Sequence, residues 1–136
     1  MAQTRPPRTL GPHHDEFWAY CAKDELRVQQ CRSCAHLQWP VAARCEQCGS
    51  SDFEWRRMSG KATLSSWCAF HHDYYRGTIE TPYAVILAKL EEGPLFLSNP
   101  VDFDEEDMDI GMRLSVDFID CVDKAGSFRL PVFRRA

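Results

Sequence analysis

The chain has 136 residues, 44% of them apolar, and it carries 16 Lys+Arg against 20 Asp+Glu. This length suits one domain or two very small ones, and this composition excludes disorder of the whole chain. Residues 61–136 carry 8 basic and 13 acidic residues, which disfavours nucleic-acid binding because that function needs a basic surface. The N-terminal residues include no apolar segment of a secretory signal, and no apolar run reaches the roughly 18 residues of a membrane span. We therefore expect a cytoplasmic protein without a membrane partner.

Residues 1–25 are expected to form an N-terminal arm and a short helix. Residues 1–12 contain Pro, Arg and Gly without periodicity, which predicts a loose arm. Asp15 is the expected N-cap of a helix in which Phe17, Trp18 and Tyr20 make a broad apolar surface. A helix this short is marginal in water, so this surface must pack either on its own chain or on a partner protein. The sequence leaves both alternatives open.

Four of the seven cysteines in the chain form the pattern CxxC-x10-CxxC: Cys31, Cys34, Cys45 and Cys48. Two such pairs supply four thiolates that fill a tetrahedral Zn²⁺ shell and leave no position for water, which predicts one structural zinc ion. Gly49 follows the second pair, where positive φ is often needed. Disulfides or a redox pair are disfavoured by the odd cysteine count and by two pairs at this spacing. Short apolar segments flank both pairs, so residues 26–58 are expected to form a rubredoxin-like zinc ribbon.

Residues 59–136 show alternating apolar and polar positions in five short segments separated by turn residues. The expected strands are residues 61–70, 83–90, 94–98, 112–122 and 127–133. This arrangement predicts a mainly β fold whose second part is a five-stranded OB barrel, with an antiparallel sandwich as the alternative. Cys68 and Cys121 lie in these strands and are expected to be buried core residues.

The order of the motifs resembles that of a known family from Phe17 to Phe133. The motifs are Phe17-Trp18, the two CxxC pairs, Cys48-Gly49-Ser50-Ser51, Trp55, Ser59-Gly60-Lys61, Pro82-Tyr83, Leu90-Glu91-Glu92-Gly93 and Ile110-Gly111-Met112. They resemble the zinc-ribbon/OB-fold acyl-CoA-associated family known as domain of unknown function thirty-five. Its members typically work as small subunits or fused modules beside thiolase-superfamily enzymes, including lipid-transfer-protein-like aldolases that shorten steroid side chains. Some members sit beside enoyl-CoA hydratase-like subunits.

The resemblance implies a non-catalytic accessory subunit of a hetero-oligomer in lipid metabolism, possessing structural zinc and working with a partner enzyme on acyl-CoA, with steroid degradation as one setting. No GxSxG, Walker or HExxH motif occurs, and no residue is assigned a catalytic role. The expected contacts to the partner or to acyl-CoA are Phe17, Trp18, Tyr20, Phe70, His71, His72, Tyr74, Tyr75, Arg76 and Tyr83. Among these, a histidine next to Arg76 would have the chemistry to move a proton or pair a phosphate, although an interface role is favoured.

Two other functions stay open at this point. One is a stand-alone acyl-CoA-binding protein. The other, less favoured, is an OB protein that binds single-stranded nucleic acid by stacking bases on exposed aromatics. The acidic run of residues 102–109 lacks the spacing of a calcium loop and is expected to be solvated or to dock a basic partner.

Overall fold

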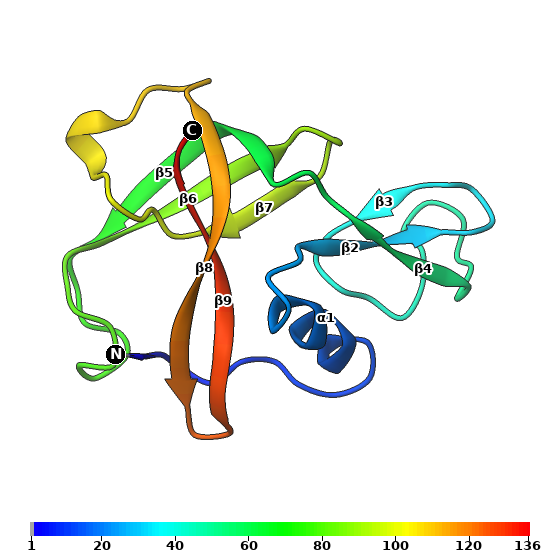
Figure 1. Cartoon of the computed structure of the whole chain (residues 1–136), viewed down its shortest axis with the longest axis horizontal. Coiled ribbons are helices and arrows are strands. Elements are labelled where there is room, and N and C mark those ends of the chain that lie inside the picture. Colours follow the sequence, from blue (N-terminus) through cyan, green and yellow to red (C-terminus); the bar gives the residue numbers. More distant parts are fainter. Residues whose placement is uncertain (1) are drawn as a thin grey trace.

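Five strands form the C-terminal barrel in the computed structural model, which describes residues 2–136 (Figure 1). They are β5 (Lys61–Phe70), β6 (Tyr83–Leu90), β7 (Leu95–Ser98), β8 (Arg113–Asp123) and β9 (Gly126–Arg135). The pairing order is β7-β6-β5-β8-β9, and the barrel closes where Pro100 bridges Phe133. A short 3₁₀ helix, η1 (Glu105–Asp107), lies in the connection from β7 to β8. The predicted mainly β fold with a five-stranded OB barrel is therefore confirmed.

A bulge in β5 changes which face of the strand points into the barrel. Ala62 and Leu64 are buried before the bulge, which falls between Leu64 and Ser66. The extra residue shifts the alternation, because side chains on a strand change face with every residue. Trp67 then packs on the core, and Cys68 is exposed. The prediction that Cys68 is buried is therefore wrong, whereas Cys121 is fully buried as expected.

The N-terminal half contains the zinc ribbon and one helix. The ribbon is a three-stranded sheet in the order β3-β2-β4, formed by β2 (Arg27–Cys31), β3 (Leu37–Gln38) and β4 (Phe53–Arg57). The helix α1 (His14–Cys21) lies beside β2 in Figure 1. The N-cap residue is His13 and not Asp15 as expected; the Asp15 carboxylate accepts a hydrogen bond from Gly11 N–H at 3.0 Å.

Aromatic side chains from the helix, the ribbon and the barrel meet in one cluster. Phe17 is only 3% exposed, and its ring centroid lies 4.5 Å from that of Trp39, which follows β3. Trp39 in turn stacks on Phe96 of β7 at 4.6 Å. Phe17 therefore packs on its own chain, which is one of the two alternatives that the sequence left open. Trp18 and Tyr20 are half-buried, and their contact with a partner stays a prediction.

The N-terminal residues are bound to the barrel, so the expectation of a loose arm is wrong. Strand β1 (Gln3–Thr4) pairs in parallel with β8, and Arg5 N–H donates to the Val122 carbonyl at 3.0 Å. The Arg8 guanidinium pairs with the Asp123 carboxylate at 2.8 Å and lies 4.2 Å from the Phe128 ring centroid. We call residues 3–8 the N-terminal strap. The strap could not be predicted from the sequence, because two residues of parallel pairing and one ion pair between residues far apart in the chain produce no periodic pattern.

The Arg8–Asp123 pair predicts that acid releases the N-terminal strap. The hydrogen bond from Arg8 holds the pKa of Asp123 well below its usual range. A carboxyl whose pKa is lowered by folding stabilises the fold above its unfolded pKa of about 4, and this stabilisation is lost as the pH falls further. Hydrogen-exchange protection of the Arg5 and Arg8 amides should therefore stay constant from pH 7 to about pH 4 and drop as the pH falls from about 4 to about 2.

Two variants separate this ion pair from general acid unfolding. In Asp123→Asn, protection of the strap should already be low at pH 7 and change little on acidification. In Asp120→Asn, which removes an exposed carboxylate paired with Arg129, the strap should behave as in the natural chain. A strap that is equally protected at about pH 4 and about pH 2 in the natural chain would contradict this assignment.

Candidate metal centre and first barrel loop

Two chain turns with the same hydrogen-bond pattern position the four patterned cysteines. In the first, Cys31 N–H donates to the His36 carbonyl at 2.9 Å, and Ala35 N–H donates to the Cys31 carbonyl at 2.8 Å. The second turn repeats both bonds from Cys45 N–H and Gly49 N–H, at 2.7 and 2.9 Å. The residue after each pair has a positive φ. The value is +77° at Gly49, as predicted, and +65° at Ala35, where the absence of glycine left the positive φ unpredicted. The repeated turn geometry points two pairs of sulfurs toward one another.

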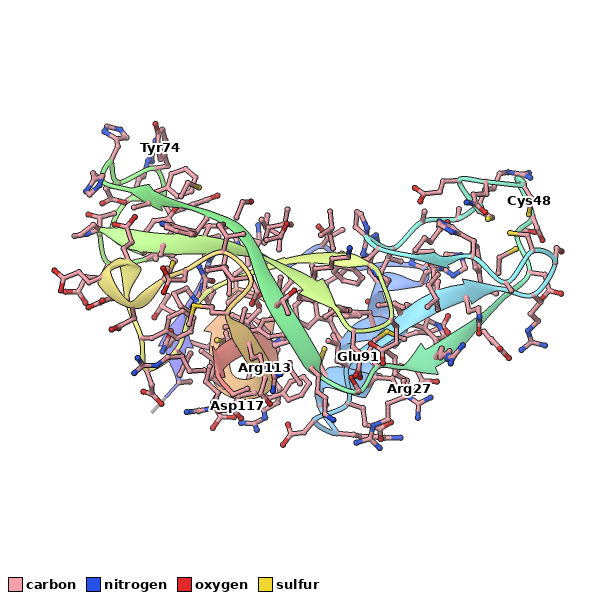
Figure 2. All side chains as sticks on the ribbon, turned by 90° about the horizontal axis from the view of Figure 1, so that it is seen from above. Arg27, Cys48, Tyr74, Glu91, Arg113 and Asp117 are labelled. Carbon is pink, nitrogen blue, oxygen red and sulfur yellow. The ribbon has the colours of Figure 1, made fainter. Side chains whose placement is uncertain are left out.

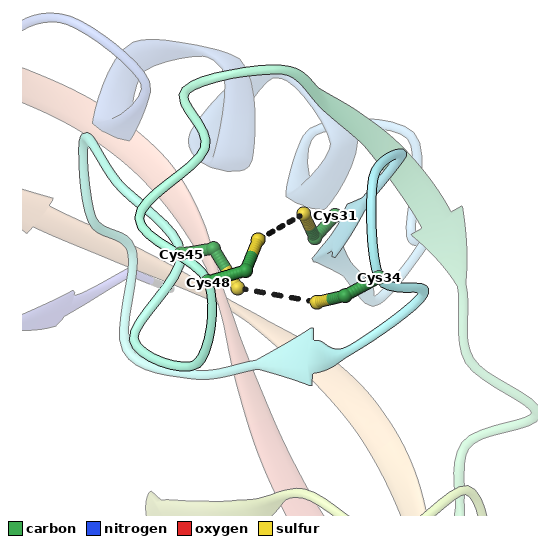
Figure 3. A group of neighbouring side chains, drawn as sticks. All are labelled: Cys31, Cys34, Cys45 and Cys48. Atoms are coloured by element: carbon green, nitrogen blue, oxygen red, sulfur yellow. Dashed lines mark hydrogen bonds between the residues drawn. The ribbon is translucent and has the colours of Figure 1, made fainter.

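The four sulfurs fit a metal ion. The Sγ atoms of Cys31, Cys34, Cys45 and Cys48 all lie within 4.8 Å of one another. The Sγ atoms of Cys31 and Cys48 are 3.5 Å apart, and those of Cys34 and Cys45 are 3.6 Å apart. Figure 3 marks both pairs. A tetrahedral shell with Zn–S bonds of about 2.3 Å places its sulfurs about 3.8 Å apart. The residues present therefore suit a zinc ion, and all four cysteines are free of disulfides.

Two buried glutamines hold the loop that carries the second cysteine pair. Gln29 and Gln38 are neighbours across β2 and β3 and are 1% and 3% exposed. The Gln29 amide donates to the Ala42 carbonyl and accepts from Ala42 N–H, both at 2.9 Å. Gln38 in the same way donates to the Arg44 carbonyl and accepts from Glu46 N–H. Each glutamine amide thus forms the pair of hydrogen bonds with the loop backbone that a neighbouring strand would otherwise form. These bonds also satisfy the buried amide, which needs partners for its donor and acceptor groups.

The first barrel loop, residues 71–82, lies far from the metal centre. Figure 2 shows Tyr74 and Cys48 at opposite ends of the long axis. Phe70 and Tyr83 are register partners on β5 and β6, and their rings stack at 5.2 Å between centroids. Tyr74 meets Phe70 edge-on at 6.2 Å. Burial raises the pKa of Tyr83.

An apolar cleft of about 550 Å³, here called the loop cleft, opens beside these rings. Its side chains are chiefly Phe70, Tyr74, Tyr75, Ile79, Tyr83, Val85 and Leu97, and no charged residue lines it. Four of the predicted contact residues, Phe70, Tyr74, Tyr75 and Tyr83, therefore share one site. The sequence analysis missed Val85 and Leu97, which lie on β6 and β7. Alternation along β6 places Val85 on the same face as Tyr83, whereas Leu97 joins that face only through the register of β7, in which it pairs with Leu87.

The polar members of the predicted cluster are not arranged for acid–base chemistry. His71, His72 and Arg76 are exposed. Within residues 2–136, none of the three has a hydrogen bond or ion pair to another side chain. The His72 ring lies 4.6 Å from the Tyr74 ring, a contact that orients the imidazole without activating it. Contact of these residues with a partner or with acyl-CoA stays a prediction.

The acidic segment serves local structure. Asp104 accepts a hydrogen bond from Glu106 N–H and caps η1, and Arg135 approaches Asp107 at 3.6 Å.

In the part of the chain that the structure describes, the four cysteines are the one group positioned to hold a metal ion. The same residues, 2–136, include no helix with the length and apolar character needed to cross a bilayer.

Two protein-family models match consecutive parts of the chain. They are described as "ChsH2, rubredoxin-like zinc ribbon domain", at residues 18–54, and "ChsH2, C-terminal OB-fold domain", at residues 55–118. The chain is 31% identical over 131 residues to the "Probable enoyl-CoA hydratase alpha subunit" of Thermomonospora curvata, covering 96% of this chain and 40% of that protein. It is 31% identical over 86 residues to the "DUF35 domain-containing scaffold protein" of Pyrococcus furiosus, covering 60% of each. The chain thus spans less than two thirds of the length of these curated relatives.

Solved structures extend the likeness to three dimensions. A chain of the "Ltp2-ChsH2(DUF35) aldolase" matches with a TM-score of 0.82 at 27% identity, over 95% of this chain and 98% of that one. A DUF35 protein of unknown function from Sulfolobus solfataricus shares the fold, with a TM-score of 0.58 at 17% identity over 78% of each chain. Given the metal centre, the barrel and these matches together, the chain belongs to the DUF35 family, in which a rubredoxin-like zinc ribbon precedes an OB-fold domain.

Proposed function

We propose that this chain is a non-catalytic accessory subunit that docks on a thiolase-like or aldolase enzyme and helps it handle an acyl-CoA substrate. The observation that carries the proposal is the match along nearly the whole length of the DUF35 chain of the Ltp2-ChsH2 aldolase. The relative described as an enoyl-CoA hydratase subunit supports a CoA thioester as the substrate class. The nucleophile or base of the reaction then belongs to the partner, and steroid side chains are one class of acyl group in keeping with the aldolase match.

The first barrel loop is the docking element in this proposal. Tyr74 and Tyr75 are 64% and 45% exposed, which is unusual for such large rings. Tyrosine and arginine are enriched at the energetic centres of protein interfaces, and Arg76 follows the two rings directly. The loop lies at the end of the barrel away from the ribbon, so a partner can cover it without disturbing the metal centre.

We also propose that the ribbon holds one structural zinc ion, which would serve this role indirectly. The ribbon strands are short, and its cysteine pairs lie on loops with little apolar core around them. Metal binding therefore contributes to folding itself, as it does in other small zinc domains. A folded ribbon keeps Trp39 against Phe17 and Phe96, so the ion fixes the orientation of the ribbon on the barrel.

Stand-alone binding of acyl-CoA is the second candidate function, and the loop cleft favours it. An apolar cleft of about 550 Å³ is within the usual size range of small-molecule sites. The two functions differ in one measurable respect. A stand-alone carrier binds CoA thioesters equally well with and without an enzyme partner, whereas an accessory subunit binds them tightly only within the complex.

Removing the two exposed tyrosines should weaken assembly with the partner enzyme. The double variant Tyr74→Ala/Tyr75→Ala should raise the Kd of the complex at least tenfold, because interface hot spots each contribute more than about 1 kcal/mol. The partner is the thiolase-like enzyme that co-purifies with this chain, and the Kd is measured by biolayer interferometry. Ile110→Ala is the control, since Ile110 is 65% exposed but does not line the loop cleft. Unchanged affinity of the double variant, or thioester turnover by this chain alone, would refute the proposal.

Removing one cysteine sulfur should cost the metal and the fold of the ribbon. Cys34→Ser should lower bound zinc from one equivalent per chain to well below one, because a serine hydroxyl is a poor ligand for zinc in a four-sulfur shell. Loss of soluble, folded protein and of partner activity should follow. Cys68→Ser removes an exposed thiol outside the metal centre and should keep both the zinc and the fold. Zinc is measured by elemental analysis and folding by near-UV circular dichroism. A Cys34→Ser protein with normal folding would show that the fold of the ribbon does not depend on the metal.

A further inference from the structure

The barrel has a seam between β7 and β9 that is closed at one end and open at the other. Just after β7, Pro100 bridges Phe133, and Phe133 N–H donates to the Asn99 carbonyl at 3.1 Å. Within residues 2–136, residues 95–97 pair with β6 alone, and Figure 1 shows β7 diverging from β9 there. This side of β7 is therefore an open sheet edge, which is a template for pairing with a further strand.

Backbone alternation places the N–H and C=O groups of Leu97 on the open edge. In an antiparallel pair, the backbone groups of successive residues point alternately toward and away from the neighbouring strand. Leu90 N–H donates to the Pro94 carbonyl at 2.9 Å, so the even-numbered residues from 94 to 98 turn these groups toward β6. The Asn99 carbonyl accepts from β9, so Leu97 turns its groups the same way. Neither group of Leu97 has a hydrogen-bond partner in the part of the chain that the structure describes.

The side chains of β7 do not protect this edge. Edge strands are commonly shielded by charged residues, by proline or by a bulge, whereas β7 has the sequence Leu-Phe-Leu-Ser. Leu95 and Leu97 are 46% and 63% exposed. An exposed edge with such apolar side chains is typical of a surface that another chain covers.

An aromatic cleft of about 370 Å³, here called the edge cleft, lies beside the open edge. Leu97 lines it together with Phe96, Phe128, Trp18 and Trp39. Trp39 stacks on Phe96 at 4.6 Å, and Trp18 meets Phe128 edge-on at 5.3 Å. These walls are fixed by packing within the chain, so little entropy is lost in ordering them when an apolar side chain enters.

The charges around the edge cleft favour an acidic group on its occupant. Arg5, Arg8 and His14 line the cleft, and no Asp or Glu does. The Asp123 carboxylate lies 2.8 Å from Arg8 and neutralises it. The Arg5 guanidinium donates to the neutral Asn99 Oδ1 at 2.8 Å and has no ion pair within residues 2–136. A carboxylate would therefore gain a charge-assisted hydrogen bond from Arg5 without displacing another anion.

These features favour an extended peptide over other occupants. Unpaired N–H and C=O groups on a strand edge are satisfied by a peptide backbone, which a hydrocarbon chain cannot replace. In β-strand addition, main-chain hydrogen bonds provide affinity and a side-chain pocket provides specificity. The N-terminal strap, α1, the ribbon and the barrel all contribute walls to the edge cleft. A single extended segment can enter such a recess, whereas the surface of a second folded copy of this chain cannot.

Resting on the proposed function, we propose that the open edge of β7 binds an extended segment of the partner enzyme by β-strand addition. The segment forms a pair of backbone hydrogen bonds with Leu97, places an apolar side chain in the edge cleft and presents an Asp or Glu to Arg5. Arg5 is bonded to Asn99, two residues from Leu97, so one short segment reaches both. This contact is additional to the proposed docking of the first barrel loop.

Peptides from the partner enzyme test the open edge. Overlapping peptides of about fifteen residues that cover the partner's sequence are titrated by fluorescence anisotropy into the full zinc-loaded chain. One segment should bind, and it should carry alternating apolar residues with an Asp or Glu beside them. Hydrogen exchange of the Leu97 amide should slow at least tenfold with this peptide and with the whole enzyme. The Phe96 amide, which faces β6, is the internal control and should change little.

Two variants at one position separate the backbone of Leu97 from its side chain. Leu97→Pro removes the N–H at the open edge, which an edge strand tolerates because that N–H has no partner in the sheet. Leu97→Pro should weaken peptide binding at least tenfold, because a carbonyl of the peptide then lacks its donor. Leu97→Ala keeps the N–H and should have a smaller effect. Near-UV circular dichroism and zinc content report whether both variants fold.

N-methylated peptides test the same hydrogen bonds without any change to the protein. A series is made in which each peptide carries one N-methyl group, at successive positions. Methylation should weaken binding only at alternate residues, because every second N–H of an added strand faces β7. This pattern is specific to strand addition, since a peptide held by its side chains alone shows no period of two.

Arg5→Gln tests the charge of the occupant. This variant should weaken the natural peptide about fivefold or more, whereas a peptide with Gln in place of its acidic residue should bind the natural chain and Arg5→Gln equally. Lys124→Gln is the control, because it makes the same change of charge at an exposed residue outside the edge cleft. Equal effects of the two variants would contradict the role of Arg5.

The possible failures are distinguishable. Failure of every peptide to bind, or equal affinity across the N-methylated series, overturns strand addition and leaves the proposed function intact if the complex still assembles. Slower exchange of the Leu97 amide in the free chain as its concentration rises would mean that a second copy covers the edge, which also overturns the assignment. A natural chain that assembles with no thiolase-like enzyme defeats the proposed function itself.

Discussion

The convergence of four cysteine sulfurs within 4.8 Å is the constraint on which the rest of the structure depends. Four thiolates at such distances repel one another strongly unless a cation lies between them. The ribbon has three strands, of which the longest have five residues, and a sheet of that size is not stable without further packing or a metal. A metal ion between the four sulfurs would therefore stabilise the ribbon together with its packing on the barrel.

The aromatic cluster of Phe17, Trp39 and Phe96 joins the ribbon to the barrel, so the position of the ribbon also sets where these rings pack. Each ring comes from a different part of the chain: the helix, the segment after β3, and β7. Because Trp39 also lines a cleft of about 370 Å³ together with Phe17 and Phe96, an intact ribbon is required for one wall of that cleft as well as for the orientation of the two halves.

Local patterns in the sequence predicted most of the fold, and interactions between distant residues account for what they missed. The CxxC spacing identifies the metal ligands, and alternation places all five barrel strands within about two residues of their observed ends. Cys68 was misplaced because a bulge shifts the alternation without a change in residue type. The strap was missed because Arg8 and Asp123 are 115 positions apart in the sequence. Gln29 and Gln38 look like surface residues until the loop they bind is folded over them.

Within the proposed function, the charge distribution of the barrel bears on which part of a CoA thioester this chain would contact. Residues 61–136, which form the barrel, carry 13 acidic and 8 basic residues, so their surface does not attract the phosphates of CoA. The exposed apolar rings are instead concentrated beside the loop cleft, where no charged residue lines the wall. An apolar face of this kind on an otherwise acidic barrel favours the acyl end of the molecule or a protein surface over the nucleotide end. In the proposed function, the partner enzyme would then bind the phosphates of CoA, because the surface of this barrel does not suit them.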